Sequence, residues 1–323
     1  MGMRLIGLVS CFAALAFSLE ARSAEPNWPQ SISIATASPG GTYHVYGAGL
    51  AKILTRVLGI TVAEHPTEGP TQNIELVESG AAQIGFVTMG AALQGWNGAG
   101  DWTKGREFRS MRAIFPMYDT PFTFAASKSS GIATIADLAG KRIGVGPHGG
   151  TAGIYLPKFL ATLKIEATLE YGSYEEIASK FLAGKIDALA AAAGAPFPAL
   201  ATLDANKAVR FIQPRREEIF ALRLAMPELT ASTIPAGGYP SLMRDYVTVG
   251  LFNFAVVRRD LPEDLVYAIV DAVFDNREEM VRAHSAAAAT VPANFARNAF
   301  LPYHRGAMRY YSNSMTRGVI LGD

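Results

Sequence analysis

Short apolar runs alternate with longer amphipathic segments along most of this chain. Runs rich in β-branched residues predict strands, and segments with apolar positions three or four residues apart predict helices. The order strand, helix, strand, helix, strand occurs twice, over residues 31–88 and 142–193. The expected strands are 31–36, 60–64, 82–88, 142–145, 167–171 and 188–193, and the expected helices are 44–58, 70–79, 152–163 and 174–182. This alternation predicts two similar α/β halves, each built on a parallel sheet.

Two further extended apolar runs, residues 121–126 and 246–257, stand on either side of the second half. Each is long enough to pass from one half to the other. We therefore expect two crossover strands that join two Rossmann-like α/β domains at a hinge, followed by a helix over 265–274. The expected lobes are residues 24–122 together with 254–323, and residues 123–253.

Residues 1–23 have the pattern of a secretory signal peptide. Arg4 provides a positive start, residues 5–19 are almost entirely apolar, and Ala21-Arg22-Ser23 places small residues at the spacing that a signal peptidase needs. An uncleaved membrane anchor is the alternative, but about 20 apolar residues are needed to span a bilayer and this run is shorter. The sequence therefore predicts an exported protein.

Composition narrows the chemistry of the exported chain. The full sequence has 323 residues, of which 50% are apolar and 18% charged, as in ordinary folded proteins. Without residues 1–23, 27 basic side chains balance 27 acidic ones, so no basic field exists to bind nucleic acid. The only cysteine is Cys11, so a mature chain would have no disulfide, no thiol nucleophile and no Cys-based zinc site.

Two glycine-rich loops join the first strand of each half to its first helix. Gly40 and Gly41 precede Thr42, the expected helix N-cap, and Gly149-Gly150-Thr151 repeats the pattern in the second half. Glycines allow a ligand to approach the backbone closely, and a helix start presents N–H groups that have no intrahelical acceptor. For one loop alone, a tight turn without a ligand is an equally good explanation. Two equivalent loops predict an anion-binding cleft between the halves.

Other chemistries fit the sequence less well. Gly144, Gly146 and Gly149 match the dinucleotide fingerprint G-x-G-x-x-G, and Glu170 ends the next strand, but a clamped ligand explains both glycine loops whereas a dinucleotide explains one. The sequence contains no P-loop and no G-x-S-x-G elbow, and its five histidines show no metal-ligand spacing. We therefore expect no catalytic residue, no metal and no cofactor.

A series of short motifs runs in order through nearly the whole exported chain. They include Gly40-Gly41-Thr42-Tyr43, Glu68-Gly69-Pro70-Thr71-Gln72-Asn73, Ser79-Gly80-Ala81-Ala82-Gln83-Ile84-Gly85, Gly140-Lys141-Arg142-Ile143-Gly144, Gly184-Lys185-Ile186-Asp187, Ile234-Pro235-Ala236-Gly237-Gly238 and Leu301-Pro302-Tyr303-His304-Arg305-Gly306-Ala307. Together they resemble the TAXI family of solute receptors, which serve tripartite ATP-independent periplasmic (TRAP) transporters. The resemblance implies a two-lobed, type II-like periplasmic-binding-protein fold. It also implies a monomeric periplasmic receptor that closes on a small organic acid, such as a glutamate-like amino acid or a dicarboxylate, and delivers it to a TRAP membrane permease.

Three positions depart from the family's usual pattern. Pro70 and Gly149 stand where serines are usual, so two hydroxyls that could hold a ligand are missing. This puts the identity of the ligand in doubt, but not its class. Arg305 stands where proline is common, and we expect it to affect packing only.

The motifs and the strand ends together give the expected ligand-binding residues. Because Pro70 opens a helix, Asn73 is expected to face the cleft, and Glu68 is expected either to bind a ligand ammonium or to be a solvated loop carboxylate. Thr88 and Ala195-Pro196 follow strands, where α/β sheets place ligand contacts. The full expected set is Gly40, Gly41, Thr42, Tyr43, Glu68, Asn73, Thr88, His148, Gly149, Gly150, Thr151, Ala195 and Pro196.

Three classes of function remain open. A binding protein that closes on a small organic anion is favoured. An exported α/β enzyme on the same scaffold is second, because the predicted cleft contains no nucleophile and no acid–base pair. A sensor lobe that presents its closed form to a membrane kinase is third.

Overall fold

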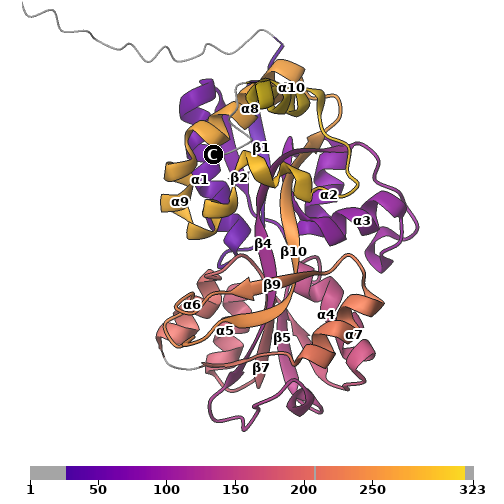
Figure 1. Ribbon diagram of the computed structural model, residues 1–323, viewed down its shortest axis with the longest axis vertical. Helices are drawn as coiled ribbons and strands as arrows, with labels where there is room; N and C mark the ends of the chain where they lie inside the picture. Colours follow the sequence, from indigo (N-terminus) through magenta and orange to yellow (C-terminus); the bar gives the residue numbers. More distant parts are fainter. Residues whose placement is uncertain (1–26, 207–208, 317–323) are drawn as a thin grey trace, which may run out of the picture.

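The computed structural model describes residues 27–206 and 209–316. The predicted signal peptide, residues 1–23, lies outside the described residues. Figure 1 shows two lobes, one above the other, with two long strands running through both. We call the upper lobe, which contains the first strand–helix repeat, lobe 1 and the lower one lobe 2.

Lobe 1 is built on three parallel strands, with β1 between β2 and β3. The strands are β1 (Ser31–Ala35), β2 (Thr61–His65) and β3 (Ile84–Thr88), and the helices are α1 (Thr42–Leu58), α2 (Pro70–Ser79), α3 (Met89–Asn97), α8 (Glu263–Asp275), α9 (Arg277–Ala283) and α10 (Arg305–Thr316). Helices α1 and α9 lie on one side of the strands and α2 and α3 on the other (Figure 1). Every residue of β3 is buried, as expected for a central strand that helices cover on both faces.

Lobe 2 repeats this plan with three parallel strands in the order β7-β5-β6. The strands are β5 (Arg142–Gly146), β6 (Thr168–Tyr171), β7 (Ala188–Ala192), β8 (Val209–Ile212) and β9 (Thr230–Ile234), and the helices are α4 (Thr151–Leu163), α5 (Tyr174–Leu182), α6 (Pro198–Ala205) and α7 (Arg216–Ala225). Short 3-10 turns occur at Asp101–Thr103, Ala136–Leu138, Ser285–Ala289 and Pro292–Arg297. Strand β7 is fully buried and consists of four alanines and one leucine. Its small side chains leave room for helices to pack against it.

The two long strands are β4 (Met111–Ser127) and β10 (Tyr246–Arg258), and they pair antiparallel. In lobe 1 β10 also pairs with β3, and in lobe 2 it pairs with β9, while β4 pairs with β7 and β8. These pairings join all ten strands into one sheet. Because no loop interrupts either strand, the lobe boundaries at residues 122/123 and 253/254 stay a prediction.

Asn253 lies where the register between β4 and β10 shifts. Its buried amide donates hydrogen bonds to the carbonyl of Tyr118 and to Thr120 Oγ1, both at 2.6 Å, and its Oδ1 accepts one from the Tyr43 hydroxyl at 2.6 Å. Satisfying a buried amide on three sides fixes the local geometry of both strands. Asn253 therefore ties the crossover to the start of α1.

The predicted order of strands and helices is confirmed in both halves. The first crossover strand is longer than the predicted 121–126, because Pro116 and Pro121 interrupt the strand signal in the sequence. Pro116 lies beside the register shift, a place where strands accept proline. Within the described ranges, no helix is long and apolar enough to cross a membrane.

Candidate functional site

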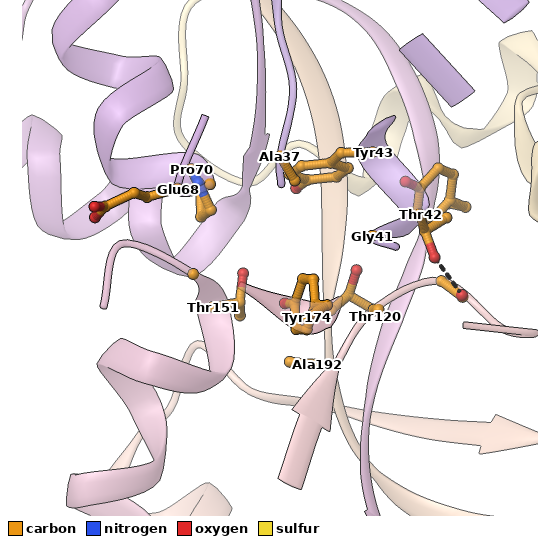
Figure 2. Close-up of a pocket in the computed structure, with 15 residues that line it drawn as sticks. Ala37, Gly41, Thr42, Tyr43, Glu68, Pro70, Thr120, Thr151, Tyr174 and Ala192 are labelled. Carbon is orange, nitrogen blue, oxygen red and sulfur yellow. Dashed lines mark hydrogen bonds between the residues drawn. The ribbon is translucent and has the colours of Figure 1, made fainter. Parts of the chain in front are cut away.

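A cavity lies between the two lobes, where helices of both lobes begin (Figure 2). The empty space between its walls is about 360 Å³ with its opening to solvent included, and about 30 Å³ of it can hold the centre of a water molecule. Lobe 1 contributes the starts of α1 and α2, lobe 2 contributes the starts of α4 and α5 and the residues that follow β7, and β4 crosses behind it. The position agrees with the rule that α/β sheets bind ligands outside the carboxyl ends of their strands.

Helices α1 and α4 present their N-termini to this cavity. Helix α1 begins at Thr42 after Gly41, and α4 begins at Thr151 after Gly150, and all four residues line the cavity. The first N–H groups of each helix have no intrahelical acceptor and carry the positive end of the helix dipole. The cavity can therefore accept a negative group without a basic side chain.

The expectation that Thr42 is the N-cap of α1 is wrong. Gly41 is the N-cap, and Thr42 is the first helical residue. The Thr42 hydroxyl donates a hydrogen bond of 2.8 Å to the carbonyl of Gly194, which belongs to lobe 2 (Figure 2). Thr42 thus ties the two lobes together at the edge of the cavity.

Three tyrosine side chains line the cavity. Tyr43 comes from α1, Tyr118 from β4 and Tyr174 from α5, and Figure 2 shows Tyr43 and Tyr174 on opposite sides of the space between the lobes. The Tyr43 hydroxyl is bonded to Asn253, as described above. The Tyr118 hydroxyl is buried and has no hydrogen-bond partner among the described residues. A buried hydroxyl without a partner is unfavourable, so this group marks a place where a ligand atom can be received.

Burial keeps these phenols protonated. It raises the pKa of Tyr43 and of Tyr118 well above the usual value of 10, and it raises the pKa of Tyr174 to about 12. At neutral pH all three hydroxyls are therefore neutral hydrogen-bond donors.

Glu68 lies at the rim of the cavity. The residue is exposed, and Figure 2 shows its carboxylate pointing away from Tyr43 and Tyr174. It also lines a second, more open hollow together with His148 and Glu176. Its geometry corresponds to the solvated loop carboxylate more than to the ammonium receptor.

Asn73 does not face the cavity, contrary to expectation. Its side chain is fully buried within lobe 1, where its amide nitrogen donates to the carbonyls of Thr36 and Phe86, each at 2.8 Å. Its oxygen accepts a hydrogen bond of 2.6 Å from Thr67. The side chain joins the loop after β1 to the end of β3, which is a structural role.

Other expected residues lie next to the cavity without lining it. The hydroxyls of Thr88 and Thr151 face each other across the lobes at 3.4 Å. His148 is exposed and stacks on Tyr171 at 3.7 Å between ring centroids. At the end of β7 and just after it, Ala192, Ala193 and Gly194 line the cavity in place of the expected Ala195 and Pro196. Gly40 and Gly149 stand beside the cavity at contacts between the lobes.

Glycines allow the lobes to touch directly. A Cβ on Gly194 would lie 2.6 Å from the ring of Tyr118 and 3.0 Å from Thr42, and a Cβ on Gly69 would lie 3.0 Å from the backbone of Gly149 and Gly150. Backbone hydrogen bonds join Thr71 to Gly149 and Ala199 to Gly40, each at 3.3 Å. The structure therefore has the lobes closed on each other.

No local sequence signal marks Tyr118, Thr120 or Tyr174 as cavity residues. Tyr118 and Thr120 belong to a strand segment between two prolines, and Tyr174 was expected only as the start of a helix. Each reaches the cavity through the crossing of β4 or the meeting of the lobes. In the described part of the chain, no group of three or more His, Cys, Asp or Glu side chains could hold a metal ion.

Comparisons with solved structures agree with this architecture. A structure described as a periplasmic transporter is 12% identical with a TM-score of 0.58, and the match covers 89% of this chain and 96% of that one. A protein from Bordetella bronchiseptica RB50 is 15% identical with a TM-score of 0.52, over 90% of this chain and 82% of that one. An ancestral arginine-binding protein with bound arginine is 14% identical with a TM-score of 0.51, over 80% and 97%.

These likenesses confirm the predicted fold class, a two-lobed periplasmic-binding-protein fold. A comparison of the sequence with family models also finds a match, which covers residues 34–314. That range contains both lobes and the whole cavity lining. The chain belongs to the NMT1-like family.

Proposed function

We propose that this chain is an extracytoplasmic solute-binding protein whose two lobes close on a small organic acid in the cavity between them. The observation that carries the proposal is the buried, unpartnered hydroxyl of Tyr118, because this residue lines a cavity that also receives two helix N-termini. The closed lobes leave this group without any protein acceptor in the described part of the chain. A ligand oxygen would satisfy it.

The cavity holds a carboxylate with neutral donors. No lysine or arginine of residues 27–206 or 209–316 lines it. Helix N-termini stabilise an anion by roughly 0.3–1 kcal/mol each at exposed sites and by up to about 2 kcal/mol when partly buried. A hydrogen bond from the Tyr118 hydroxyl to a charged oxygen adds about 1.5–3 kcal/mol. One carboxylate is therefore well served, whereas a second would have no comparable set of donors.

The remaining lining favours a ligand that is less polar than glutamate. Rings of Tyr43, Tyr118 and Tyr174 and the small residues after β7 form most of the wall. Glu68 is exposed and points away, and Pro70 supplies no hydroxyl. We propose a monocarboxylate with a mainly apolar body as the first candidate and a glutamate-like amino acid or dicarboxylate as the second.

The role of Glu68 separates these candidates. If Glu68 binds the ammonium group of a ligand, glutamate should bind far better than 2-oxoglutarate, and Glu68→Gln should abolish that preference. If Glu68 is a solvated carboxylate, as its position favours, the two ligands should bind alike and the substitution should change neither affinity.

The partner we propose is a TRAP-type membrane permease, to which the protein delivers its ligand. The ordered motifs that resemble the TAXI family support this proposal. The signal-peptide pattern supports a periplasmic location, and we propose that the receptor acts as a monomer. An enzyme on this scaffold would need a nucleophile or an acid–base pair in the cavity, but among the described residues Glu68 is the only carboxylate that lines it and no histidine does. A sensor lobe would share the same site and differ only in its membrane partner.

A calorimetric screen of the mature protein tests this proposal. The panel should contain aromatic and aliphatic monocarboxylates, dicarboxylates, amino acids, and the uncharged amides of the best acids. Binding of at least one acid with one site per chain, and at least tenfold weaker binding of its amide, is the expected result. Equal binding of acid and amide, or no binding by any acid, contradicts it.

A further inference from the structure

Lobe 1 carries a second concave surface, near the start of β4. We call it the arginine groove, defined by Arg112, Arg259 and Arg305. Arg112 lies at the start of β4, Arg259 directly follows β10, and Arg305 is the first residue of α10. None of these residues lines the cavity described above.

Backbone hydrogen bonds hold the three segments together. The N–H of Arg259 donates to the carbonyl of Ser110 at 2.8 Å, and the N–H of His304 donates to the carbonyl of Ala113 at 3.0 Å. The N–H of Ala113 in turn donates to the carbonyl of Pro302 at 3.0 Å. The groove is therefore built on paired strand ends and a helix start, which give it a fixed shape.

The carboxylates in the groove already have other partners. Asp260 accepts hydrogen bonds from Arg258 at 2.9 and 3.1 Å, and Glu263 accepts one from Arg309 at 3.2 Å. Arg258 and Arg309 are not part of the groove lining. Each of these two acids therefore has a direct partner that is not one of the groove arginines.

The groove arginines are left without a counter-charge in direct contact. Arg112 donates to the carbonyls of Arg109 and Met111, each at 2.9 Å, which are neutral acceptors. Arg259 and Arg305 are exposed and make no ion pair with any residue in 27–206 or 209–316. That Arg305 affects packing only stays a prediction, and its side chain is exposed in the groove.

The remaining groups add to the positive potential. Arg305 is the first residue of the 12-residue helix α10, so the positive end of that helix dipole also lies at the groove. Glu78, a carboxylate outside the groove that acts on the charge of Arg112, accepts two hydrogen bonds from Ser110. Three guanidinium groups on one concave surface suit a tetrahedral oxyanion, because each planar fork can bind two of its oxygens.

We propose that the arginine groove binds a phosphate group, either a soluble phosphate or the headgroup phosphate of a membrane lipid. Both sources present the same tetrahedral, negatively charged oxygens. A site on lobe 1 that uses no residue of the cavity leaves the movement of lobe 2 free. The groove could then be occupied while the lobes open and close on their solute.

Inorganic phosphate and vesicles are the two probes of the test. Phosphate binding to the mature protein is measured by calorimetric titration, with sulfate as a competitor. Sedimentation with vesicles of phosphatidylglycerol is compared with sedimentation with vesicles of phosphatidylcholine. Binding of inorganic phosphate with competition by sulfate identifies a soluble source, and sedimentation with phosphatidylglycerol vesicles alone identifies a lipid source.

Variants connect either result to the groove. Arg259→Gln and Arg305→Gln should each weaken the observed binding roughly tenfold or more, because each removes charge-assisted hydrogen bonds to the anion. Arg216→Gln, at an exposed position of α7 in lobe 2, is the matched control and should leave binding unchanged. Melting temperatures confirm that all variants fold. Absence of binding to both probes, or equal loss in the Arg216 control, overturns the proposal.

Discussion

The hydrogen-bond partners of a buried polar side chain indicate whether it binds the ligand or stabilises the fold. Tyr118 and Tyr46 illustrate the difference, since both are fully buried tyrosines whose rings lie 5.3 Å apart. The Tyr46 hydroxyl is paired with Thr290 at 2.9 Å, whereas the Tyr118 hydroxyl has no partner in the described part of the chain. The two hydroxyls should therefore respond oppositely to removal.

Tyr118→Phe should weaken binding of the organic acid by about ten- to a hundredfold, because a hydrogen bond to a charged group contributes about 1.5–3 kcal/mol. It should leave stability unchanged or slightly raised, since an unpaired buried hydroxyl is removed. Calorimetric titration and thermal unfolding measure the two effects. Tyr46→Phe, the control, should lose about 1 kcal/mol of stability and keep its affinity. Unchanged affinity in Tyr118→Phe would show that the Tyr118 hydroxyl does not bind the ligand.

Asn73→Ala should destabilise lobe 1 without changing ligand affinity. The substitution leaves the carbonyls of Thr36 and Phe86 unpaired in the core, and we expect a loss of about 3 kcal/mol or more in the free energy of unfolding. Urea unfolding measures this loss, and titration of the folded variant measures affinity. If Asn73→Ala binds the ligand more weakly but is as stable as the wild type, Asn73 contacts the ligand after all.

The difference between Asn73 and Thr42 shows how far the sequence predicts the site. The strand–helix rhythm and the glycine loops predict where the cavity lies, because they reflect local conformation. They do not predict side-chain direction, which depends on packing between distant segments. Asn73 pairs with residues 37 and 13 positions away, and Thr42 with one 152 positions away. Tyr118 enters the cavity through β4, whose full length two prolines conceal in the sequence.

At the scale of elements, loops that meet between the lobes control closure. The loop after β7 touches lobe 1 at Gly194 and again at Pro196, whose carbonyl lies 3.1 Å from Nε2 of His284. These contacts exist only when the lobes are together. Substitutions here should therefore change affinity by altering how closely the lobes can approach each other.

Gly194→Ala should weaken ligand binding roughly tenfold or more by preventing full closure. Its Cβ would lie 2.6 Å from the Tyr118 ring, and such overpacking costs about 1–3 kcal/mol. Gly184→Ala is the control: its φ of +67° makes the substitution strained, but its Cβ would meet nothing within 4 Å. The control should lower the melting temperature and keep its affinity. Equal affinities in both variants would show that the Gly194 contact does not limit closure.

His284 should make closure sensitive to acid. Its Nδ1 accepts a hydrogen bond of 3.2 Å from the N–H of Ala286, so Nε2 carries the proton that is donated to Pro196. Burial lowers the pKa of His284 below its usual value of 6.5, and the hydrogen bond to Pro196 opposes part of that shift. The neutral form therefore supports the closed state above about pH 6.5, and this contribution is lost as the pH falls through the lowered pKa.

Ligand affinity should accordingly decrease between pH 7.5 and pH 5 in the wild type and change less in His284→Gln. Titrations across this range measure the difference. The pKa of His304 is lowered too, but that residue lies within lobe 1 and should affect stability alone. Identical pH profiles in wild type and His284→Gln would contradict the role of His284 in closure.

At the scale of the whole molecule, the two crossover strands let each lobe move as a body. Each lobe has its own apolar core, and β4 and β10 connect them without a loop. The sequence predicts this architecture well, because two strand–helix repeats flanked by extended runs have few other solutions. It does not predict the residue at which the lobes divide, because both strands continue through the boundary.

The distance between the lobes, with and without ligand, tests the central claim most directly. The sequence outside residues 1–23 contains no cysteine, so Lys52→Cys and Ser179→Cys give unique labelling sites for a fluorophore pair. Both positions are exposed, on helices α1 and α5, which begin at the cavity and extend into opposite lobes. Single-molecule energy transfer should show a wider and more open distribution without ligand. It should collapse to one short distance when the organic acid identified by the screen is saturating. A distribution that stays the same at saturating acid would contradict closure of the lobes on a ligand.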